Sequence, residues 1–139
     1  MLNSEKIETI MTRGVFSVDF DDSVKKADDL MKEEKIKHVP VVDGSKFIGM
    51  ITERTLMEYT LRQIYDYDDT FGEIGYNKIS EFENVMARDV HVIYPEDSIS
   101  KAIEIMTKKR VDYLPVVDWD KNLVGIVTAM DILMFIKNK

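Results

Sequence analysis

Apolar residues along the chain follow two different spacings, and together these predict a mixed α/β fold. Runs rich in Val and Ile predict six short buried strands, at residues 15–18, 38–42, 47–51, 90–94, 113–117 and 123–127. Other apolar residues recur at helical spacing, namely Val24, Ala27, Leu30 and Met31, and later Ile99, Ala102, Ile103 and Met106. Because this spacing places them on one side of a helix, they predict two amphipathic helices with core-facing stripes.

Turn and capping residues delimit these elements. Asp43 and Gly44 predict a tight hairpin turn, and residues 118–122 predict a longer one. The pairs Asp22-Ser23 and Asp97-Ser98 suit the N-terminal caps of the two amphipathic helices. Further helices are expected over residues 6–11, 53–64, 81–86 and 130–136.

The order of elements occurs twice. Met11-Thr12-Arg13 recurs as Met86-Ala87-Arg88, an offset of 75 residues that also relates Asp22-Ser23 to Asp97-Ser98 and Pro40 to Pro115. After one inserted residue, Gly49 and Thr52 match Gly125 and Thr128. The chain is therefore an internal duplication of a β-α-β-β-α unit.

One such copy is too small to bury its sheet alone. We expect the copies, residues 6–64 and 81–136, to pack sheet against sheet with pseudo-twofold symmetry. They would form one α/β (α+β) module with two equivalent clefts. Residues 65–80 are expected to connect the copies.

Composition narrows the classes of function. The chain has 139 residues and a net charge of −7. It contains no cysteine, and this excludes disulfides, thiolate metal sites and a cysteine nucleophile. Nucleic-acid binding is not expected, because the short basic cluster at residues 108–110 suits a helix C-terminus. The longest apolar stretch, residues 123–136, is shorter than a membrane span and contains Asp131. We therefore expect a cytoplasmic protein without a membrane or signal segment.

No catalytic motif or metal site is predicted. Phosphate-loop, zinc-protease and nucleophile-elbow motifs are absent from the sequence, so we do not expect an enzyme. His38 and His91 each stand alone. Asp66, Asp68, Asp69 and Glu73 in the acidic connector suggest a calcium loop, but their spacing does not match the EF-hand. A solvated connector is the expectation.

The stretch of residues 123–133 carries the main candidate chemistry. It passes from a buried strand into a helix, with Thr128 at the N-cap position and Asp131 in the first turn. A helix N-terminus offers unpaired N–H groups, and an acidic side chain there can accept hydrogen bonds from a ribose diol. The alternative is a capping box, in which the two side chains only complete the helix start.

The repeated pattern resembles a known family. Met-x-Arg-x-Val, Asp-Ser-x-x-x-Ala-x-x-x-Met, Pro-Val-Val-Asp and Gly-x-[Ile/Val]-Thr are similar to the CBS domain (cystathionine-β-synthase domain). Two in tandem resemble a CBS pair, or Bateman module. The resemblance implies a regulatory module that binds AMP, ADP, ATP or S-adenosylmethionine between the repeats. It also implies a homodimer formed through helices 53–64 and 130–136, and a regulated protein partner of unknown identity.

The resemblance also implies the site residues of a first cleft. Thr128 and Asp131 match the family's Gly-x-x-[Ser/Thr]-x-x-Asp motif, in which the Asp holds ribose and the hydroxyl residue lies near the phosphates. The facing residues would be Val15, Phe16, Ser17, Val18, Lys37, His38, Val39 and Pro40. Arg13 is a weaker phosphate candidate, and a solvated helix end explains Lys37 equally well.

The second cleft departs from the family pattern. Thr55 stands where the ribose Asp belongs, so a weaker or empty site is expected, with Arg54 as partial compensation. The implied residues are Thr52, Arg54, Thr55, Val90, His91, Ile93, Val111, Asp112, Tyr113, Leu114 and Pro115. Asp112 adds negative charge where a phosphate would lie.

A second function remains open from the sequence. The chain would then be a dimerisation or protein-interaction module whose clefts bind no ligand. Ligand-dependent stability separates the two hypotheses.

Overall fold

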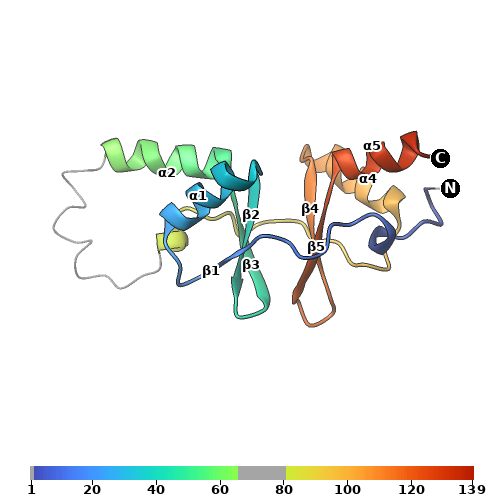
Figure 1. Cartoon of the computed structure of the whole chain (residues 1–139), viewed down its shortest axis with the longest axis horizontal. Coiled ribbons are helices and arrows are strands. Elements are labelled where there is room, and N and C mark those ends of the chain that lie inside the picture. Colours follow the sequence, from blue (N-terminus) through green and yellow to red (C-terminus); the bar gives the residue numbers. More distant parts are fainter. Residues whose placement is uncertain (1, 66–80) are drawn as a thin grey trace. The chain divides into compact units, whose positions relative to one another are not determined.

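The computed structural model describes residues 2–65 and 81–139, which form two compact units (Figure 1). The N-terminal unit comprises Phe16–Gly44 and Ile48–Val90, and the C-terminal unit comprises Met1–Val15, Ser45–Phe47 and His91–Lys139. The units do not follow chain order, because residues 1–15 belong to the unit built from the second copy. Residues 81–90 likewise belong to the unit built from the first.

The N-terminal unit contains a three-stranded sheet in the order β1-β2-β3. Its strands are β1 (Val18–Asp19), β2 (His38–Asp43) and β3 (Lys46–Thr52), and Val18 of β1 pairs in parallel with Val41 of β2. Its helices are α1 (Val24–Glu34), α2 (Glu53–Tyr65) and the short η2 (Glu81–Asn84). Its core contains Val18, Val24, Ala27, Met31, Val39, Val41, Ile51, Phe82, Val85 and Met86.

The C-terminal unit contains a two-stranded antiparallel sheet, β4 (Tyr113–Val117) and β5 (Leu123–Thr128). The short η1 (Ile7–Thr9), α4 (Ile99–Lys109) and α5 (Ala129–Lys137) complete it. Helix α4 packs against β4, and α5 packs against β5 (Figure 1). Its core contains Ile7, Met11, Ile93, Ile99, Ala102, Met106, Leu114, Val116, Val127 and Ile132.

Helices α1 and α4 begin and end in the same way, as the duplication predicts. The side chain of Ser23 accepts a hydrogen bond from the N–H of Lys26, and Ser98 does the same for Lys101. The predicted capping pairs are confirmed, and the serine of each pair is the N-cap. Both helices also end at a left-handed residue, Lys35 or Arg110, whose N–H returns to the last turn.

The first strand of each copy is shorter than predicted. Residues 15–17 lie outside the sheet and β1 covers only Val18–Asp19, while residues 90–94 contribute a single parallel bridge, from Ile93 to Val116. The apolar pattern reports burial, but strand length depends on how far a partner strand runs alongside. The predicted helices at 6–11 and 81–86 are single 3-10 turns, because so few residues cannot sustain an α-helical ladder.

Each leading segment is bound to a strand at a glycine. In the C-terminal unit, Thr12 and Ile126 exchange backbone hydrogen bonds of 2.8 and 3.0 Å beside Gly125. A Cβ added at Gly125 would lie 2.9 Å from both the Met11 Sδ and the Thr12 carbonyl oxygen. In the N-terminal unit, Ala87 and Met50 exchange bonds of 2.9 and 3.0 Å beside Gly49. Glycine therefore permits the close approach that completes each unit.

Gly125→Ala should destabilise the fold by about 1–3 kcal/mol through overpacking, measured by urea unfolding. In a Met11→Ala background the same substitution should cost less, because one of the two clashing groups is gone. Equal losses in the two backgrounds would contradict the Met11 contact.

The carboxylate of Asp22 stabilises the start of α1. Its Oδ2 accepts a 2.7 Å hydrogen bond from the N–H of Asp19 and a 3.1 Å bond from Lys26 Nζ. The backbone hydrogen bond from Asp19, helped by Lys26, lowers the pKa of Asp22 below that of an ordinary aspartate. A lowered folded-state pKa stabilises the protein above the unfolded-state pKa, and this stabilisation is lost as the pH falls through the folded value.

Asp22→Asn should therefore reduce stability at pH 7, and the gap to the wild type should narrow as the pH falls below about 4. Urea unfolding of both proteins between pH 7 and pH 3 measures this gap. A gap of the same size at pH 7 and pH 3 would show that the charge of Asp22 contributes nothing.

Candidate functional site

Thr128 and Asp131 join β5 to α5 through a reciprocal pair of hydrogen bonds. The N–H of Asp131 donates to Thr128 Oγ1 at 3.2 Å, and the N–H of Thr128 donates to Asp131 Oδ2 at 2.8 Å. The capping box considered from the sequence is thus present. It fixes the carboxylate of Asp131 at the beginning of α5.

The capping box uses one carboxylate oxygen and leaves the other available. Asp131 is half-buried, and its Oδ1 forms no hydrogen bond to any of the described residues. An ionised carboxylate has two acceptor oxygens, so capping does not exhaust its capacity. The two roles considered for Asp131 are therefore compatible.

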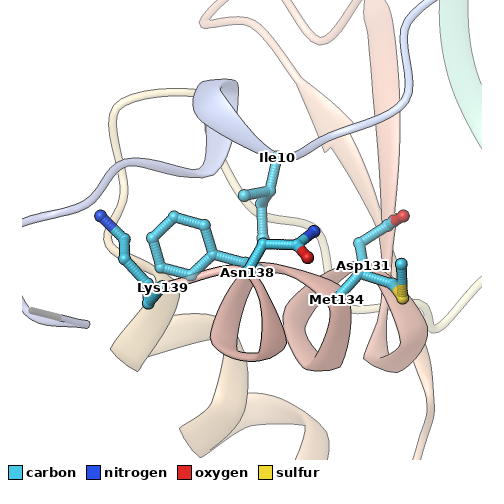
Figure 2. A pocket seen from close by; sticks show the side chains of 6 residues that line it. Ile10, Asp131, Met134, Asn138 and Lys139 are labelled. Carbon is cyan, nitrogen blue, oxygen red and sulfur yellow. The ribbon is translucent and has the colours of Figure 1, made fainter.

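Asp131 lines a groove of about 370 Å³ in the C-terminal unit (Figure 2). One face of α5 forms the groove together with a residue of the leading segment, and its lining residues are Ile10, Asp131, Met134, Phe135, Asn138 and Lys139. The Nζ of Lys139 lies 4.8 Å from the centre of the Phe135 ring and 3.5 Å from Glu5 Oε1. The groove has the volume of a small-molecule site.

Sequence reasoning found Asp131 but missed the other groove residues. Positions 134, 135 and 138 follow Asp131 at helical spacing, and that spacing was the available indication. Ile10 had none, because it comes from a leading segment that the sequence assigned to the other copy.

The corresponding box in the N-terminal unit offers no carboxylate, because a threonine hydroxyl takes the place of the aspartate. The Oγ1 of Thr55 accepts from the N–H of Thr52 at 2.8 Å and donates to the Thr52 carbonyl oxygen at 3.0 Å. Arg54, the predicted compensating cation, pairs with Glu58 at 3.1 Å and is 88% exposed. The two copies thus share a backbone geometry but differ in what they offer a ligand.

The remaining predicted residues are divided between the units. The N-terminal unit contains Phe16, Ser17, Val18, Lys37, His38, Val39 and Pro40, together with Thr52, Arg54, Thr55 and Val90. The C-terminal unit contains Val15, Thr128 and Asp131, together with His91, Ile93, Val111, Asp112, Tyr113, Leu114 and Pro115. Each predicted set has members in both units.

Burial differs among the predicted residues. Lys37, His91, Arg54 and Asp112 are exposed, as is Phe16, whereas six apolar side chains are buried: Val18, Val39, Pro40, Ile93, Leu114 and Pro115. The other residues of the two predicted sets are half-buried. A buried side chain leaves only the backbone for ligand contact.

Tyr113 and Asp112 lie beside the start of α5. Tyr113 pairs with Thr128 across the sheet, and the carbonyl oxygen of Asp112 accepts from the N–H of Ala129 at 2.9 Å. Burial, and then the negative charge of Asp112, raise the pKa of Tyr113 above that of an ordinary tyrosine. Tyr113 therefore stays neutral at physiological pH.

The described residues bear on metal binding and on membrane insertion. Within residues 2–65 and 81–139, no three His, Cys, Asp or Glu side chains are grouped closely enough to hold a metal ion. The calcium loop considered at residues 66–73 lies outside this part of the chain. Among the same residues, no helix has the length and apolar character needed to cross a bilayer.

Comparison with known proteins identifies the family. A model of the CBS domain matches the chain twice, over residues 7–62 and 79–138. The chain belongs to the CBS domain family. It is a tandem CBS pair, or Bateman module, and the resemblance seen in the sequence is confirmed.

A curated relative is inosine-5'-monophosphate dehydrogenase of Thermoplasma acidophilum, 35% identical over 127 residues. That match covers 91% of this chain but 22% of the dehydrogenase. The chain spans about a fifth to a quarter of the first curated relatives it matches, at 22%, 24% and 21% of their lengths.

Solved CBS pairs share the fold. A structure of CBSX2 in complex with AMP has a TM-score of 0.80 at 21% identity, covering 96% of this chain and 97% of that one. The CBS pair of MJ0100, in complex with 5'-methylthioadenosine and S-adenosyl-L-methionine, has a TM-score of 0.74 at 23% identity, covering 96% of each chain. The predicted mixed α/β fold with two CBS repeats is thereby confirmed.

Proposed function

We propose that this CBS pair is a regulatory module that binds an adenosine-containing ligand, whose ribose is held by Asp131. The observation that carries the proposal is the half-buried carboxylate of Asp131, oriented by its capping box and with Oδ1 unused by the described residues. Such an acceptor needs no rearrangement before it takes a ribose hydroxyl, and a charged acceptor forms the stronger hydrogen bonds.

The ligands of related structures support the chemical class. CBSX2 was crystallised with AMP, and the MJ0100 pair with 5'-methylthioadenosine and S-adenosyl-L-methionine. Adenosine is common to all three ligands. For this chain we propose AMP, ADP, ATP or S-adenosylmethionine, with Thr128 beside the phosphates. The contacts predicted for residues 15–18 and 37–40 belong to the same proposal.

The proposed role is regulation rather than catalysis. A ligand shifts a conformational equilibrium only by its difference in affinity for the two states, so a regulated protein would respond to that shift. We propose that Thr55 leaves the second site weaker or empty, because its hydroxyl is already used within its own box.

Asp131→Asn should abolish binding while keeping the fold, because the amide oxygen still accepts from the N–H of Thr128. With the wild type, the correct ligand at a hundred times its dissociation constant should raise the free energy of unfolding by about 2.7 kcal/mol, a shift of several degrees. Thermal unfolding with each of the four ligands measures this shift.

The matched control is Thr55→Ala, which disrupts the corresponding box of the other copy and should leave the ligand-induced shift unchanged. If none of the four ligands stabilises the wild type, or if Asp131→Asn responds as the wild type does, the ligand-sensing proposal is wrong.

The alternative function, a dimerisation or protein-interaction module without a ligand, is favoured by a different observation. Large apolar side chains are exposed on α5, namely Met130 at 62%, Leu133 at 59%, Met134 at 46% and Ile136 at 43%. Helix α2 likewise exposes Met57, Leu61 and Ile64. Exposed apolar surface of this kind marks interaction sites. We propose a homodimer through these helices under either function.

Leu133→Glu should weaken this dimer roughly tenfold or more, because it would bury an unpaired carboxylate in an apolar interface. Sedimentation velocity over a range of concentrations measures the association. Lys137→Glu changes a charge on the same helix and is the control. A wild-type chain that stays monomeric at high concentration would exclude the dimer.

A further inference from the structure

Tyr94 and Trp119 form an exposed aromatic pair in the C-terminal unit. Their rings stack with a centroid distance of 4.2 Å and an interplanar angle of 12°. Trp119 nevertheless keeps 73% of its surface exposed, the largest value among the exposed large apolar residues of the described chain. The stack thus contributes to burying Tyr94 but leaves most of the indole in water.

The first copy shows that the fold does not need this stack. Asp19 occupies the position of Tyr94, since each donates its backbone N–H to the carboxylate three residues later, Asp22 or Asp97. Gly44 follows Asp43 directly, as Trp119 follows Asp118. In the N-terminal unit, the N–H of Gly44 donates to Asp19 Oδ1 at 3.2 Å. In the first copy, therefore, one hydrogen bond links the two positions that are linked by stacked aromatic rings in the second copy.

Both aromatic residues are held on rigid turns. The carbonyl oxygen of Tyr94 accepts from the N–H of Asp97 at 3.0 Å, and its N–H donates to Asp97 Oδ2 at 2.9 Å. Asp118 Oδ1 accepts from the N–H groups of Asp120 and Asn122, each at 2.9 Å, on either side of the left-handed Lys121. A preorganised aromatic surface loses little conformational entropy when a partner binds.

The charges around the pair are mainly negative. Asp120 follows Trp119, and Glu96 lies two residues after Tyr94. Glu8 is also close, because its N–H donates to the carbonyl oxygen of Pro95 at 3.0 Å. Glu8, Glu96 and Asp120 are exposed and form no ion pair with the described residues. Nearby cations are Lys121, Lys101 and Lys46. Lys101 Nζ pairs with Asp97 Oδ1 at 3.3 Å, and Lys46 Nζ donates to the Asp120 carbonyl oxygen.

We propose that the Tyr94–Trp119 pair is a docking surface for a basic segment of a partner protein, with an arginine guanidinium stacked on the open face of Trp119. Indole is the best aromatic face for a cation, and guanidinium is planar and weakly hydrated, so it stacks well. The carboxylates of Glu96 and Asp120 complement its charge. Their charge would repel a nucleic acid or other polyanion. This surface is distinct from the Asp131 groove and does not depend on an adenosine ligand.

The test uses the peptide Gly-Arg-Gly-Arg-Gly carrying fluorescein, followed by anisotropy. The same peptide with citrulline in place of arginine is the neutral control. The arginine peptide should bind saturably, with the citrulline peptide weaker by fivefold or more. Quenching of the intrinsic fluorescence should accompany binding, because Trp119 is the only tryptophan of the chain.

Two double variants locate the binding surface, and a third is the control for the change in charge. Tyr94→Asp with Trp119→Gly installs the hydrogen bond of the first copy and removes the stacking surface, so binding of the arginine peptide should weaken even though the negative charge is kept. Glu96→Gln with Asp120→Asn should weaken arginine binding roughly fivefold. Glu33→Gln with Glu34→Gln makes the same charge change at exposed positions of α1 and should not. If the aromatic double variant fails to fold by circular dichroism, the two charge variants decide the test.

Three outcomes would overturn the proposal. The first is equal binding of the arginine and citrulline peptides, and the second is an equal loss of binding in both charge variants. The third is quenching of Trp119 by self-association as the protein concentration rises. The last result would assign the surface to a second copy of the chain.

Discussion

The close approach of each leading segment to a strand glycine is the constraint on which both units depend. At Gly125 and at Gly49, backbone hydrogen bonds join a segment from one copy to a strand of the other, and a methionine covers the glycine. Without this contact, Met11 and Ile7 would leave the core of the C-terminal unit. The groove beside Asp131 would also lose Ile10. The fold and the candidate site therefore rest on the same contact.

The paired boxes show how a duplicated fold separates structure from function. Helix capping needs one acceptor at the third helical position, and Thr55 and Asp131 both supply it. A carboxylate offers a second oxygen, whereas the hydroxyl of Thr55 has its proton and an acceptor site already bound to Thr52. A single substitution therefore changes what the helix start offers a ligand without changing how the chain folds there.

Local rules in the sequence predicted local structure well. The caps at Ser23 and Ser98, the hairpin turns and the helical stripes depend on neighbouring residues, and the structure has them where they were predicted. The lengths of the first strands were overestimated, because strand length depends on pairing with residues far along the chain. In these two segments only Val18, Asp19 and Ile93 pair with another strand. The internal repeat predicted the order of the helices and strands, because the same series of patterns occurs twice along the chain.

The candidate site was predictable only in part. Asp131 followed from its position at a strand-to-helix junction, and its capping partner followed with it. Val39 and Leu114 lie in strands that were predicted to be buried, and they are buried. The family motif nevertheless names them as ligand residues, because a motif does not distinguish a side-chain contact from a backbone one. Ile10 was unpredictable since exchange of segments between copies leaves no trace in the order of residues.

The exchange of leading segments has a consequence for the origin of the chain. A single ancestral copy would carry a leading segment shaped for a partner copy and an unfilled place at its own strand glycine. Two such molecules would complete each other, and joining their genes would change the connectivity but not the contacts. The duplicated chain can thus be regarded as a covalently closed dimer. Its two halves are then free to diverge, as they have at Thr55 and Asp131.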